Sequence, residues 1–212
     1  MSLILHGYFR SSAAWRVRIA LRLKGLAFEN VFHHLRRNEQ NAVDYLAINP
    51  QGLVPTLDLG DGKTLTQSLA ICEYLNAIYP EPTLLPSDPL ECARVRAFTQ
   101  AIACDIHPIN NLKILNRLRK HGLDEAAVNA WAQQTIYEGL SACVALLEAA
   151  PPTDFCFGNQ PTLADICLVP QLGSARRFNV DLRWPRLVEI EERCMRMSAF
   201  RDAAPELQPD AE

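Results

Sequence analysis

A turn of polar residues, Arg10-Ser11-Ser12, lies between a short apolar run and a helical pattern. The N-terminus of a helix presents unpaired backbone N–H groups and a partial positive charge, so such a turn makes an anion-binding site. A serine hydroxyl there could hydrogen-bond a thiolate and favour ionisation of a thiol, whose unperturbed pKa is about 8.5. The alternative is that Ser11 or Ser12 only caps the helix.

Two further clusters could hold a peptide ligand. Leu53-Val54-Pro55 opens a strand pattern at a position where proline is tolerated. Gln67-Ser68 precedes a helical pattern, so the Ser68 hydroxyl and amide could hold a carboxylate and Gln67 could bind an amine or amide. Each cluster is a weak signal by itself. Together the three suit a tripeptide with a central thiol and a charged group at each end.

The elements that must position these clusters alternate between strand and helix. The patterns predict strands over 3–8, 27–34, 54–59 and 63–66, a helix that begins at Ser11 or Ser12, and helices over 39–48 and 68–78, the last capped by Ser68. Gly60-Asp61-Gly62 is a strong hairpin signal. The order β-α-β-α-β-β-α with an antiparallel closing hairpin is typical of a thioredoxin-like domain. In such a domain we expect Pro55 in the cis form, which exposes the backbone of Val54 to a peptide ligand.

A proline-rich stretch follows at 79–90, with four of the chain's 14 prolines. Because proline removes an amide donor and fixes φ, this stretch cannot continue a helix and is interpreted as a linker. The sequence therefore predicts an α+β thioredoxin-like domain over residues 1–80, a linker over 81–89 and an all-α domain over 90–212.

The patterns beyond the linker are helical throughout. They predict helices over 90–120 with a kink at Pro108, over 124–150, over 163–178, and over 185–197 and 198–204. In the helix over 124–150, one face is predicted to carry Val128, Trp131, Thr135, Gly139, Cys143 and Leu147. Thr162-x-x-Asp165 is a capping box before a helix that is apolar nearly all round, which predicts a central, buried helix.

Composition excludes several classes of protein. A net charge of −3 and a pI of about 6.0 argue against nucleic-acid or membrane-surface binding, which needs a basic excess. No apolar run reaches the roughly 18 residues of a membrane span, and the natural inference is a cytoplasmic protein. Seven widely spaced cysteines without Cys-x-x-Cys, and five histidines without His-Glu-x-x-His, indicate neither a disulfide framework nor a metal site. Most of the cysteines are expected in the core.

The segment Ser11–Gly25, SSAAWRVRIALRLKG, resembles the signature of zeta-class glutathione transferases, Ser-Ser-Cys-x-Trp-Arg-Val-Arg-Ile-Ala-Leu. This motif is quite specific. Looser matches, shared across glutathione transferases, are NPQGLVPTL from Asn49, QSLAICEYL from Gln67, CDIHPINN from Cys104, and GNQPTLADICLVPQL with ARRFNVDL from Gly158 to Leu182. The resemblance covers essentially the whole chain.

The zeta class includes maleylacetoacetate isomerases and bacterial maleylpyruvate isomerases. The resemblance implies that the first domain holds glutathione and that the helical domain forms the site of the second substrate. It implies cis–trans isomerisation of a small dicarboxylate keto acid of aromatic amino acid catabolism. Thiolate addition to the conjugated double bond allows rotation, and loss of the thiolate gives the trans product and regenerates glutathione. The resemblance also implies a homodimer.

The resemblance assigns roles to particular residues. The residues that it assigns to catalysis are Arg10, Ser11, Ser12 and Arg177, and those that it assigns to glutathione binding are Gln51, Val54, Gln67, Ser68, His107 and Asn111. The two arginines suit a dianion, because guanidinium groups bind carboxylates bidentately.

Structural alternatives stand beside the functional roles in the second domain. Arg177 could instead complement a helix dipole, and the neighbouring Arg176 is then a surface residue. His107, Asn110 and Asn111 cluster at Pro108, where His107 could be a capping or buried structural residue and Lys113 could add positive charge.

One departure from the signature is Ala13, which stands where the zeta class has cysteine. A mechanism that needs a protein thiol at this position is excluded, but an isomerase needs only the glutathione thiolate. Two other functions remain open: general conjugation of electrophiles to glutathione, and a non-catalytic glutathione-binding interaction module. Paired arginines favour the isomerase over general conjugation, and the intact serine turn favours catalysis over the non-catalytic module.

Overall fold

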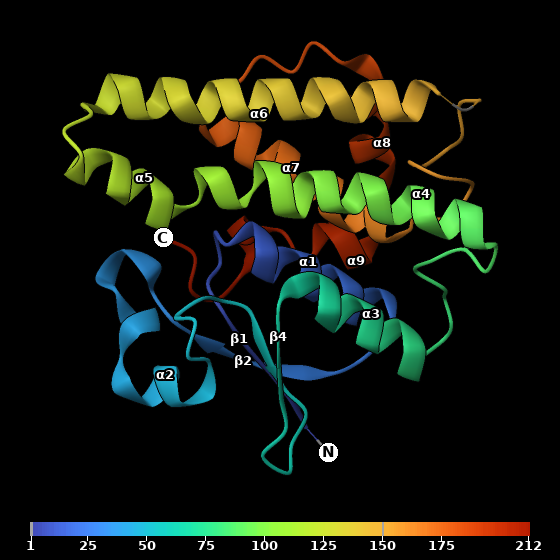
Figure 1. Ribbon diagram of the computed structural model, residues 1–212. Helices are drawn as coiled ribbons and strands as arrows, with labels where there is room; N and C mark the ends of the chain where they lie inside the picture. The colour runs from blue at the N-terminus through green and yellow to red at the C-terminus, as the bar shows by residue number, and fades with distance from the viewer. Residues whose placement is uncertain (1, 150) are drawn as a thin grey trace. The chain divides into compact units, whose positions relative to one another are not determined.

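The computed structural model describes residues 2–149 and 151–212, and these divide into two compact units (Figure 1). The first unit is Met1–Leu84 with Met195–Glu212, and the second is Leu85–Cys194. The prediction places residues 90–212 in one helical domain, whereas the structure groups residues 195–212 with the first unit.

The first unit is built on a four-stranded sheet. Its strands are β1 (Leu3–Gly7), β2 (Phe28–Phe32), β3 (Thr56–Asp58) and β4 (Thr64–Thr66). The strand order is β2-β1-β3-β4, with β2 parallel to β1 and both β3 and β4 antiparallel to their neighbours. The order of the elements along the chain is the predicted one, and the hairpin across Gly60 and Gly62, both of which adopt positive φ, is antiparallel as predicted.

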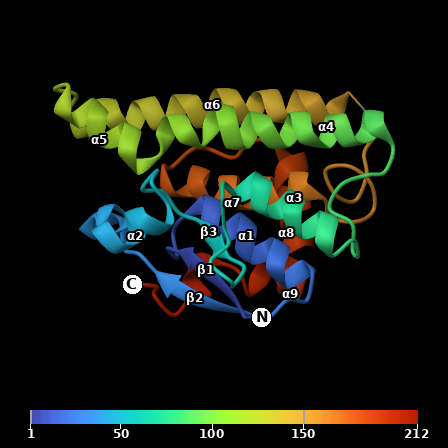
Figure 2. The ribbon, with the colours of Figure 1, turned by 60° about the horizontal axis from the view of Figure 1, so that its bottom comes forward.

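Four α-helices belong to the first unit: α1 (Ser12–Leu23), α2 (Val43–Ile48), α3 (Ser68–Ile78) and α9 (Ser198–Arg201). Helices α1 and α3 pack side by side, and α9 packs against α1 (Figures 1 and 2). The parallel pairing of β1 with β2 needs a crossover connection, which α1 supplies. The turn that enters α1 therefore lies at the end of a strand held between two others.

Two predictions within this unit are corrected. The helix predicted over 39–48 is a 3-10 turn (Glu39–Asn41) followed by α2, because Ala42 adopts an extended backbone with ψ 146°. The N-cap of α3 is Gln67, which makes no side-chain cap bond, and not Ser68, which is the first helical residue. The side chain of Ser68 is buried, and its Oγ accepts a hydrogen bond from Arg16.

The second unit is helical, and none of its described residues forms a strand, as predicted. Its elements are α4 (Pro89–Gln100), the π-helix η3 (Ala101–Ile106), the 3-10 turn η4 (Pro108–Asn110), α5 (Leu112–Lys120), α6 (Glu125–Glu148), α7 (Leu163–Arg177) and α8 (Pro185–Arg196), the last of which crosses the unit boundary. The helical run breaks at Pro108, as predicted. The break is preceded by a wider π turn, in which the amide of His107 donates to the carbonyl of Ile102 at 2.9 Å.

The buried face of α6 differs from the prediction. Its buried residues are Val128, Ala132, Ile136, Leu140, Cys143 and Leu147. Trp131, predicted on that face, is 42% exposed. Gly139 lies beside the buried row, where a Cβ atom would stand 2.3 Å from Ile106 Cγ1, so glycine permits η3 to approach α6. The predicted end of this helix at Ala150 lies outside the described residues.

Helix α7 is central and buried, as its capping box and apolar sequence predict. The Asp165 carboxylate accepts hydrogen bonds from the amides of Thr162 at 2.7 Å and Cys156 at 2.8 Å. Asp165 is fully buried, and this burial raises its pKa. Five of the seven cysteines are buried, as expected, whereas Cys92 is half-buried and Cys104 is exposed.

Over the part of the chain that the structure describes, no helix is both long and apolar enough to cross a bilayer. The same residues contain no group of three or more His, Cys, Asp or Glu side chains arranged to hold a metal ion.

Candidate active site

The first part of the candidate site is the turn between β1 and α1. The amide of Ser11 donates to the carbonyl of Tyr8 at 3.0 Å and closes this turn. Ser11 is the N-cap of α1, and its Oγ accepts a hydrogen bond from the amide of Ala14 at 3.2 Å. That bond uses Oγ as an acceptor, so the hydroxyl hydrogen is left to donate to a ligand.

The two serines of the turn differ in exposure. Ser11 is half-buried, whereas Ser12 is only 4% exposed at the first position of α1. The structure thus assigns the cap to Ser11 and turns the side chain of Ser12 inward. Arg10 is half-buried, and its guanidinium carbon lies 6.0 Å from the ring centroid of Phe9.

The second part of the site is the entry to β3. The Val54–Pro55 peptide bond is cis, as predicted. Just before it, the carbonyl of Leu53 accepts hydrogen bonds from Tyr45 Oη at 2.6 Å and from Asn49 Nδ2 at 2.7 Å. These two donors fix the backbone that leads into Val54. The sequence analysis gave no role to Tyr45 or Asn49, although the NPQG segment contains Asn49.

The third part is the N-terminus of α3. Gln67 has φ 69° and ψ 115°, an unusual conformation for a residue other than glycine. Its Nε2 donates to Gln51 Oε1 at 3.0 Å, so the structure brings these two predicted residues together. Ser68 follows and is 6% exposed. The first amides of α3 have no partner within the helix, as at any helix N-terminus, so this end of α3 favours an anion.

A buried arginine lies behind this helix N-terminus. Arg16, in α1, is only 1% exposed, and its Nη1 donates to Ser68 Oγ at 3.4 Å. Its Nε and Nη2 atoms have no hydrogen-bond partner within the described part of the chain. Neither Arg16 nor Arg18 was among the predicted site residues. Arg18 is buried as well, at 3% exposure.

In the second unit, the predicted residues surround the break at Pro108. Asn111 is the N-cap of α5, and its Oδ1 accepts a hydrogen bond from the amide of Ile114 at 3.0 Å. His107 is half-buried at the end of the π turn, Asn110 is 5% exposed, and Lys113 is exposed. Asn111 thus has a capping function, which does not prevent its amide group from meeting a ligand.

The neighbouring arginines at the end of α7 have different partners. Arg176 makes a bidentate ion pair with Glu191 of α8, with Nη1 2.5 Å from Oε1 and Nη2 on Oε2. Arg177 is exposed, donates from Nη2 to Ser174 Oγ at 3.0 Å, and lies 5.6 Å from the ring centroid of Phe178. Arg176 is exposed as predicted, yet it also ties two helices together.

Comparison with protein-family models decides the family. The model of the glutathione S-transferase N-terminal domain matches residues 10–78, and the model of the glutathione S-transferase C-terminal domain matches residues 114–208. The chain belongs to the glutathione S-transferase family. The resemblance to the zeta class is confirmed by the relatives.

Among curated proteins, the chain is 48% identical over 210 residues to a maleylpyruvate isomerase of a Ralstonia species, which covers 98% of this chain and 99% of the relative. A solved maleylpyruvate isomerase, described as a bacterial glutathione S-transferase of the zeta class in its holo form, is 47% identical, with a TM-score of 0.96 over 99% of this chain and 100% of the other. The maleylacetoacetate isomerase of Anaeromyxobacter dehalogenans, solved with dicarboxyethyl glutathione and citrate in its active site, is 41% identical with a TM-score of 0.89 over 100% and 98% of the two chains.

The first unit of this glutathione S-transferase offers groups that fit glutathione. A buried cation without an ion-pair partner is costly, and an anion at the start of α3 would face Arg16 through Ser68. Gln67 and Gln51 provide amide groups beside it. Ser11 provides a hydroxyl at a second helix N-terminus, where a thiolate is favoured. The first unit therefore contains one helix N-terminus that suits a carboxylate and another that suits a thiolate.

Proposed function

We propose that this glutathione S-transferase is a glutathione-dependent cis–trans isomerase of maleylpyruvate or maleylacetoacetate. One observation carries the proposal: the turn between β1 and α1 offers a hydroxyl and helix amides to a thiolate, with Arg10 beside them, in a chain 48% identical to a maleylpyruvate isomerase along almost its whole length. When bound, glutathione supplies the thiolate that adds to the double bond of the substrate and later leaves it.

Ser11 holds the reacting sulfur in this proposal. Its Oγ accepts the capping bond from Ala14, so its hydroxyl hydrogen donates to the thiolate. The amides of the first turn of α1 add positive potential, and both effects lower the pKa of a bound thiol. Ser12 is 4% exposed and supports the turn from inside.

The α3 N-terminus binds the γ-glutamyl end of glutathione. Ser68 and the first amides of α3 take the carboxylate, with the charge of Arg16 behind them. Gln67, held against Gln51, takes the amino group through its side-chain oxygen. The backbone of Val54, fixed by the bonds to Leu53, pairs with the cysteinyl part of the peptide.

Arg10 and Arg177 bind the carboxylates of the second substrate, and His107 and Asn111 contact glutathione. The motif matches to the zeta class support these four roles, and a dianion needs such cationic groups. The isomerase of Anaeromyxobacter dehalogenans gives further support, because it was solved with dicarboxyethyl glutathione and citrate in its active site. Both compounds are polycarboxylates, as a maleyl keto acid is.

Ala13 is compatible with this activity. The residue is buried in the first turn of α1 and carries no functional group. Isomerisation uses a single thiol, that of glutathione, and needs none from the protein. A reaction in which glutathione forms a disulfide with a cysteine at this position is excluded.

A homodimer in the cytoplasm also belongs to the proposal, since zeta-class transferases are expected in that form. Sedimentation equilibrium should give about twice the 23.7 kDa of one chain. A mass near 23.7 kDa would contradict the dimer without affecting the proposed reaction.

The decisive experiment supplies the purified chain with maleylpyruvate, and in parallel with maleylacetoacetate, at a catalytic concentration of glutathione. We expect conversion to the fumaryl product with no net loss of glutathione. A rate that does not depend on glutathione would contradict the mechanism. Rapid conjugation of a neutral chloronitrobenzene without isomerisation of either keto acid would indicate a general transferase instead.

A further inference from the structure

The turn that carries Arg10 and Ser11 gives the N–H and C=O of Phe9 no partner of its own. Its closing bond runs from the amide of Ser11 to the carbonyl of Tyr8, so Phe9 and Arg10 are the central residues. In such a four-residue turn, the N–H and C=O of the first central residue take no part in the closing bond. Phe9 is 6% exposed, so its two backbone groups need partners from elsewhere in the protein.

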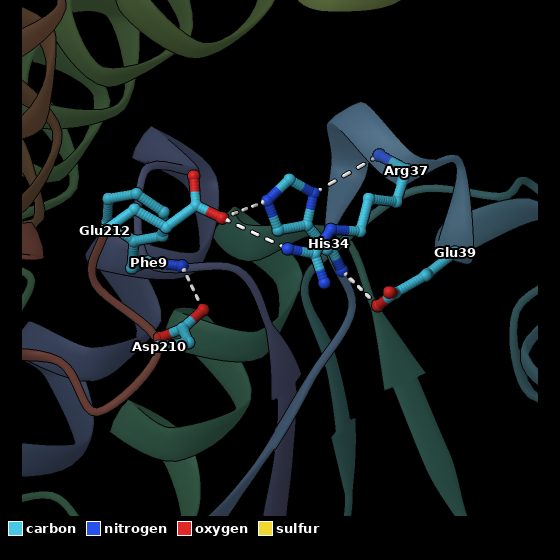
Figure 3. A network of polar contacts seen from close by, with 6 residues as sticks. All are labelled: Phe9, His34, Arg37, Glu39, Asp210 and Glu212. Atoms are coloured by element: carbon cyan, nitrogen blue, oxygen red, sulfur yellow. Dashed lines mark hydrogen bonds and ion pairs between the residues drawn. The ribbon is translucent and has the colours of Figure 1, made fainter.

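Both partners come from charged side chains. The amide of Phe9 donates to Asp210 Oδ2 at 2.9 Å, across 201 positions of sequence (Figure 3). The carbonyl of Phe9 accepts from Nη2 of the buried Arg18 at 3.0 Å. The backbone of one residue, Phe9, is thus held at its amide by a carboxylate and at its carbonyl by a guanidinium.

The same arginine anchors the segment that contains Asp210. Arg18 Nε donates to the carbonyl of Ala203 at 3.0 Å, just after α9. Gln208 Nε2 donates to the carbonyls of Ala204 at 2.8 Å and Asp202 at 3.2 Å, which folds residues 202–208 onto themselves. The contacts form a closed circuit from Phe9 to Asp210, along the segment to Ala203, and through Arg18 back to Phe9.

We propose that Asp210 is a positioning residue for the Arg10–Ser11 turn, and that it acts with Arg18 to hold the Phe9 peptide in the orientation that presents Ser11 to the bound thiol. The inference rests on the proposed function. Asp210 touches no reacting atom in this scheme. Its loss frees the amide of Phe9, lets the turn open, and moves the Ser11 hydroxyl away from the thiolate.

Burial and charge support this role. Burial lowers the pKa of Arg18 to about 10, and the Asp210 charge opposes that change, so Arg18 remains protonated at neutral pH. The second oxygen of Asp210, Oδ1, is buried without a hydrogen-bond partner in the described residues. The carboxylate is therefore committed to one bond, that with Phe9, in the field of Arg18.

The same segment contains a matched control. Glu212 Oε1 lies 2.7 Å from His34 Nε2 and 3.7 Å from Arg37 Nη2, so these polar contacts are made to residues that follow β2, and Glu212 makes neither of the two bonds to Phe9 (Figure 3). Loss of Glu212 weakens the attachment of the segment, but it leaves both bonds of Phe9 in place. A general effect of loosening the segment is therefore separated from a specific effect on the turn.

The first experiment needs no glutathione. Amide hydrogen exchange is measured in the full chain for peptides that cover residues 8–14, in the unaltered protein and in Asp210→Ala and Glu212→Ala. We expect exchange at the turn to rise by about tenfold or more in Asp210→Ala and to stay within about twofold in Glu212→Ala. Unchanged exchange at the turn in Asp210→Ala would overturn the proposal, whatever the protein's activity.

The second experiment follows the thiol. The ultraviolet absorbance of the thiolate gives the pKa of bound glutathione, and steady-state rates with maleylpyruvate give kcat and KM. In Asp210→Ala we expect the thiol pKa to rise by about one unit and kcat to fall by about tenfold at neutral pH, with a smaller change in the KM of glutathione. Asp210→Asn keeps an oxygen that accepts from Phe9 and should lose less than Asp210→Ala.

The outcomes distinguish failure of the positioning role of Asp210 from failure of the proposed function. A lower melting temperature in Asp210→Ala with unchanged thiol pKa and kcat would overturn positioning and leave Asp210 a structural residue. Failure of the unaltered protein to lower the thiol pKa of glutathione would contradict the proposed function, and the exchange experiment would still decide whether Asp210 holds the turn.

Discussion

Arg16 Nη1 lies 3.4 Å from Ser68 Oγ, so the guanidinium of a residue that is only 1% exposed lies beside the first side chain of α3. Because Arg16 is the donor in this contact, the Ser68 hydroxyl hydrogen is left to donate to a ligand. An anion at the start of α3 would therefore meet the Ser68 hydroxyl as a donor and the helix amides, with the positive charge of Arg16 behind Ser68. This arrangement makes Arg16 a part of the proposed glutathione site that never contacts glutathione.

Replacement of Arg16 should weaken glutathione binding and leave the chemical step nearly intact. In Arg16→Met we expect the KM of glutathione to rise by about tenfold, equivalent to about 1.4 kcal/mol, with kcat at saturating glutathione within about twofold of the unaltered protein. Arg22→Met is the control, because Arg22 is exposed near the end of the same helix. Equal effects of the two substitutions would remove Arg16 from the site.

Ser11→Ala should lower the rate more than Ser12→Ala. Ser11 is half-buried with its hydroxyl hydrogen available to a ligand, whereas Ser12 is 4% exposed. We expect kcat/KM to fall by roughly 10- to 150-fold in Ser11→Ala, the range of a charge-assisted hydrogen bond, and by much less in Ser12→Ala. The assay is run well below the melting temperature, because loss of the N-cap also costs about 1 kcal/mol of stability.

Ser11→Thr is the matched variant, since threonine keeps both the cap and the hydroxyl. Small and equal losses in Ser11→Ala and Ser12→Ala would mean that the helix amides alone ionise the thiol.

The thioredoxin-like order of elements was predictable because its signals are local. Alternating patterns, the Gly60–Gly62 hairpin and the Thr162–Asp165 capping box each involve residues a few positions apart, and the structure contains all three. The face of α6 was predicted wrongly at Trp131, since Gly139 and Thr135 resemble small core residues in sequence. The packing of η3 against α6 at Gly139 is a contact between two elements, and helical periodicity within one segment gives no information about such a contact.

The candidate site was predictable where it follows the start of a helix and not where it depends on distant contacts. Ser11, Gln67 and Ser68 are next to helix starts, so the sequence signal and the structural position coincide. The roles of Arg16 and Asp210 depend on contacts across 52 and 201 positions. An arginine between Trp15 and Val17 was the available signal, since both neighbours are buried, but the sequence alone names no partner for it.

Arg177→Ala should reduce use of the dianionic substrate far more than conjugation of a neutral electrophile. A desolvated charge-assisted pair contributes on the order of 1.5–3 kcal/mol, so kcat/KM for maleylpyruvate should fall by roughly 10- to 150-fold. With a chloronitrobenzene no carboxylate contact is lost, and the rate should stay within about twofold.

Arg176→Ala is the control for a structural effect, because Arg176 holds Glu191 and links α7 to α8. It should lower the melting temperature and affect both substrates alike. Parallel losses on both substrates in Arg177→Ala would return Arg177 to the role of a partner for the helix dipole.

A pair of histidines beneath the entry to β3 should make stability depend on pH. His6 Nδ1 lies 3.0 Å from His33 Nε2, and the rings stack with centroids 5.2 Å apart. One nitrogen donates and the other accepts, so the bond does not survive protonation of both rings. Burial lowers the pKa of His6, opposed by the charge of Asp58, and burial followed by the proximity of His6 lowers the pKa of His33.

The sign of the effect follows from these directions. The unfolded chain takes up protons at the ordinary histidine pKa of 6.5, and the folded protein only at lower pH. Between these values the unfolded state binds more protons, so folding stability is complete above pH 6.5 and is lost as the pH falls below it. We expect the melting temperature to be level from pH 8 to 7 and to fall by several degrees between pH 6.5 and 5.

His33→Gln keeps a hydrogen-bonding group beside His6 but does not titrate, so its curve of melting temperature against pH should be flatter than that of the unaltered protein over this interval. His121→Gln, at the exposed C-cap of α5, should retain the full slope. Since carboxylates also titrate near the lower limit, the difference between the melting curves is the quantity that matters. Superimposable slopes for all three proteins would show that the pair His6 and His33 contributes nothing to the pH dependence.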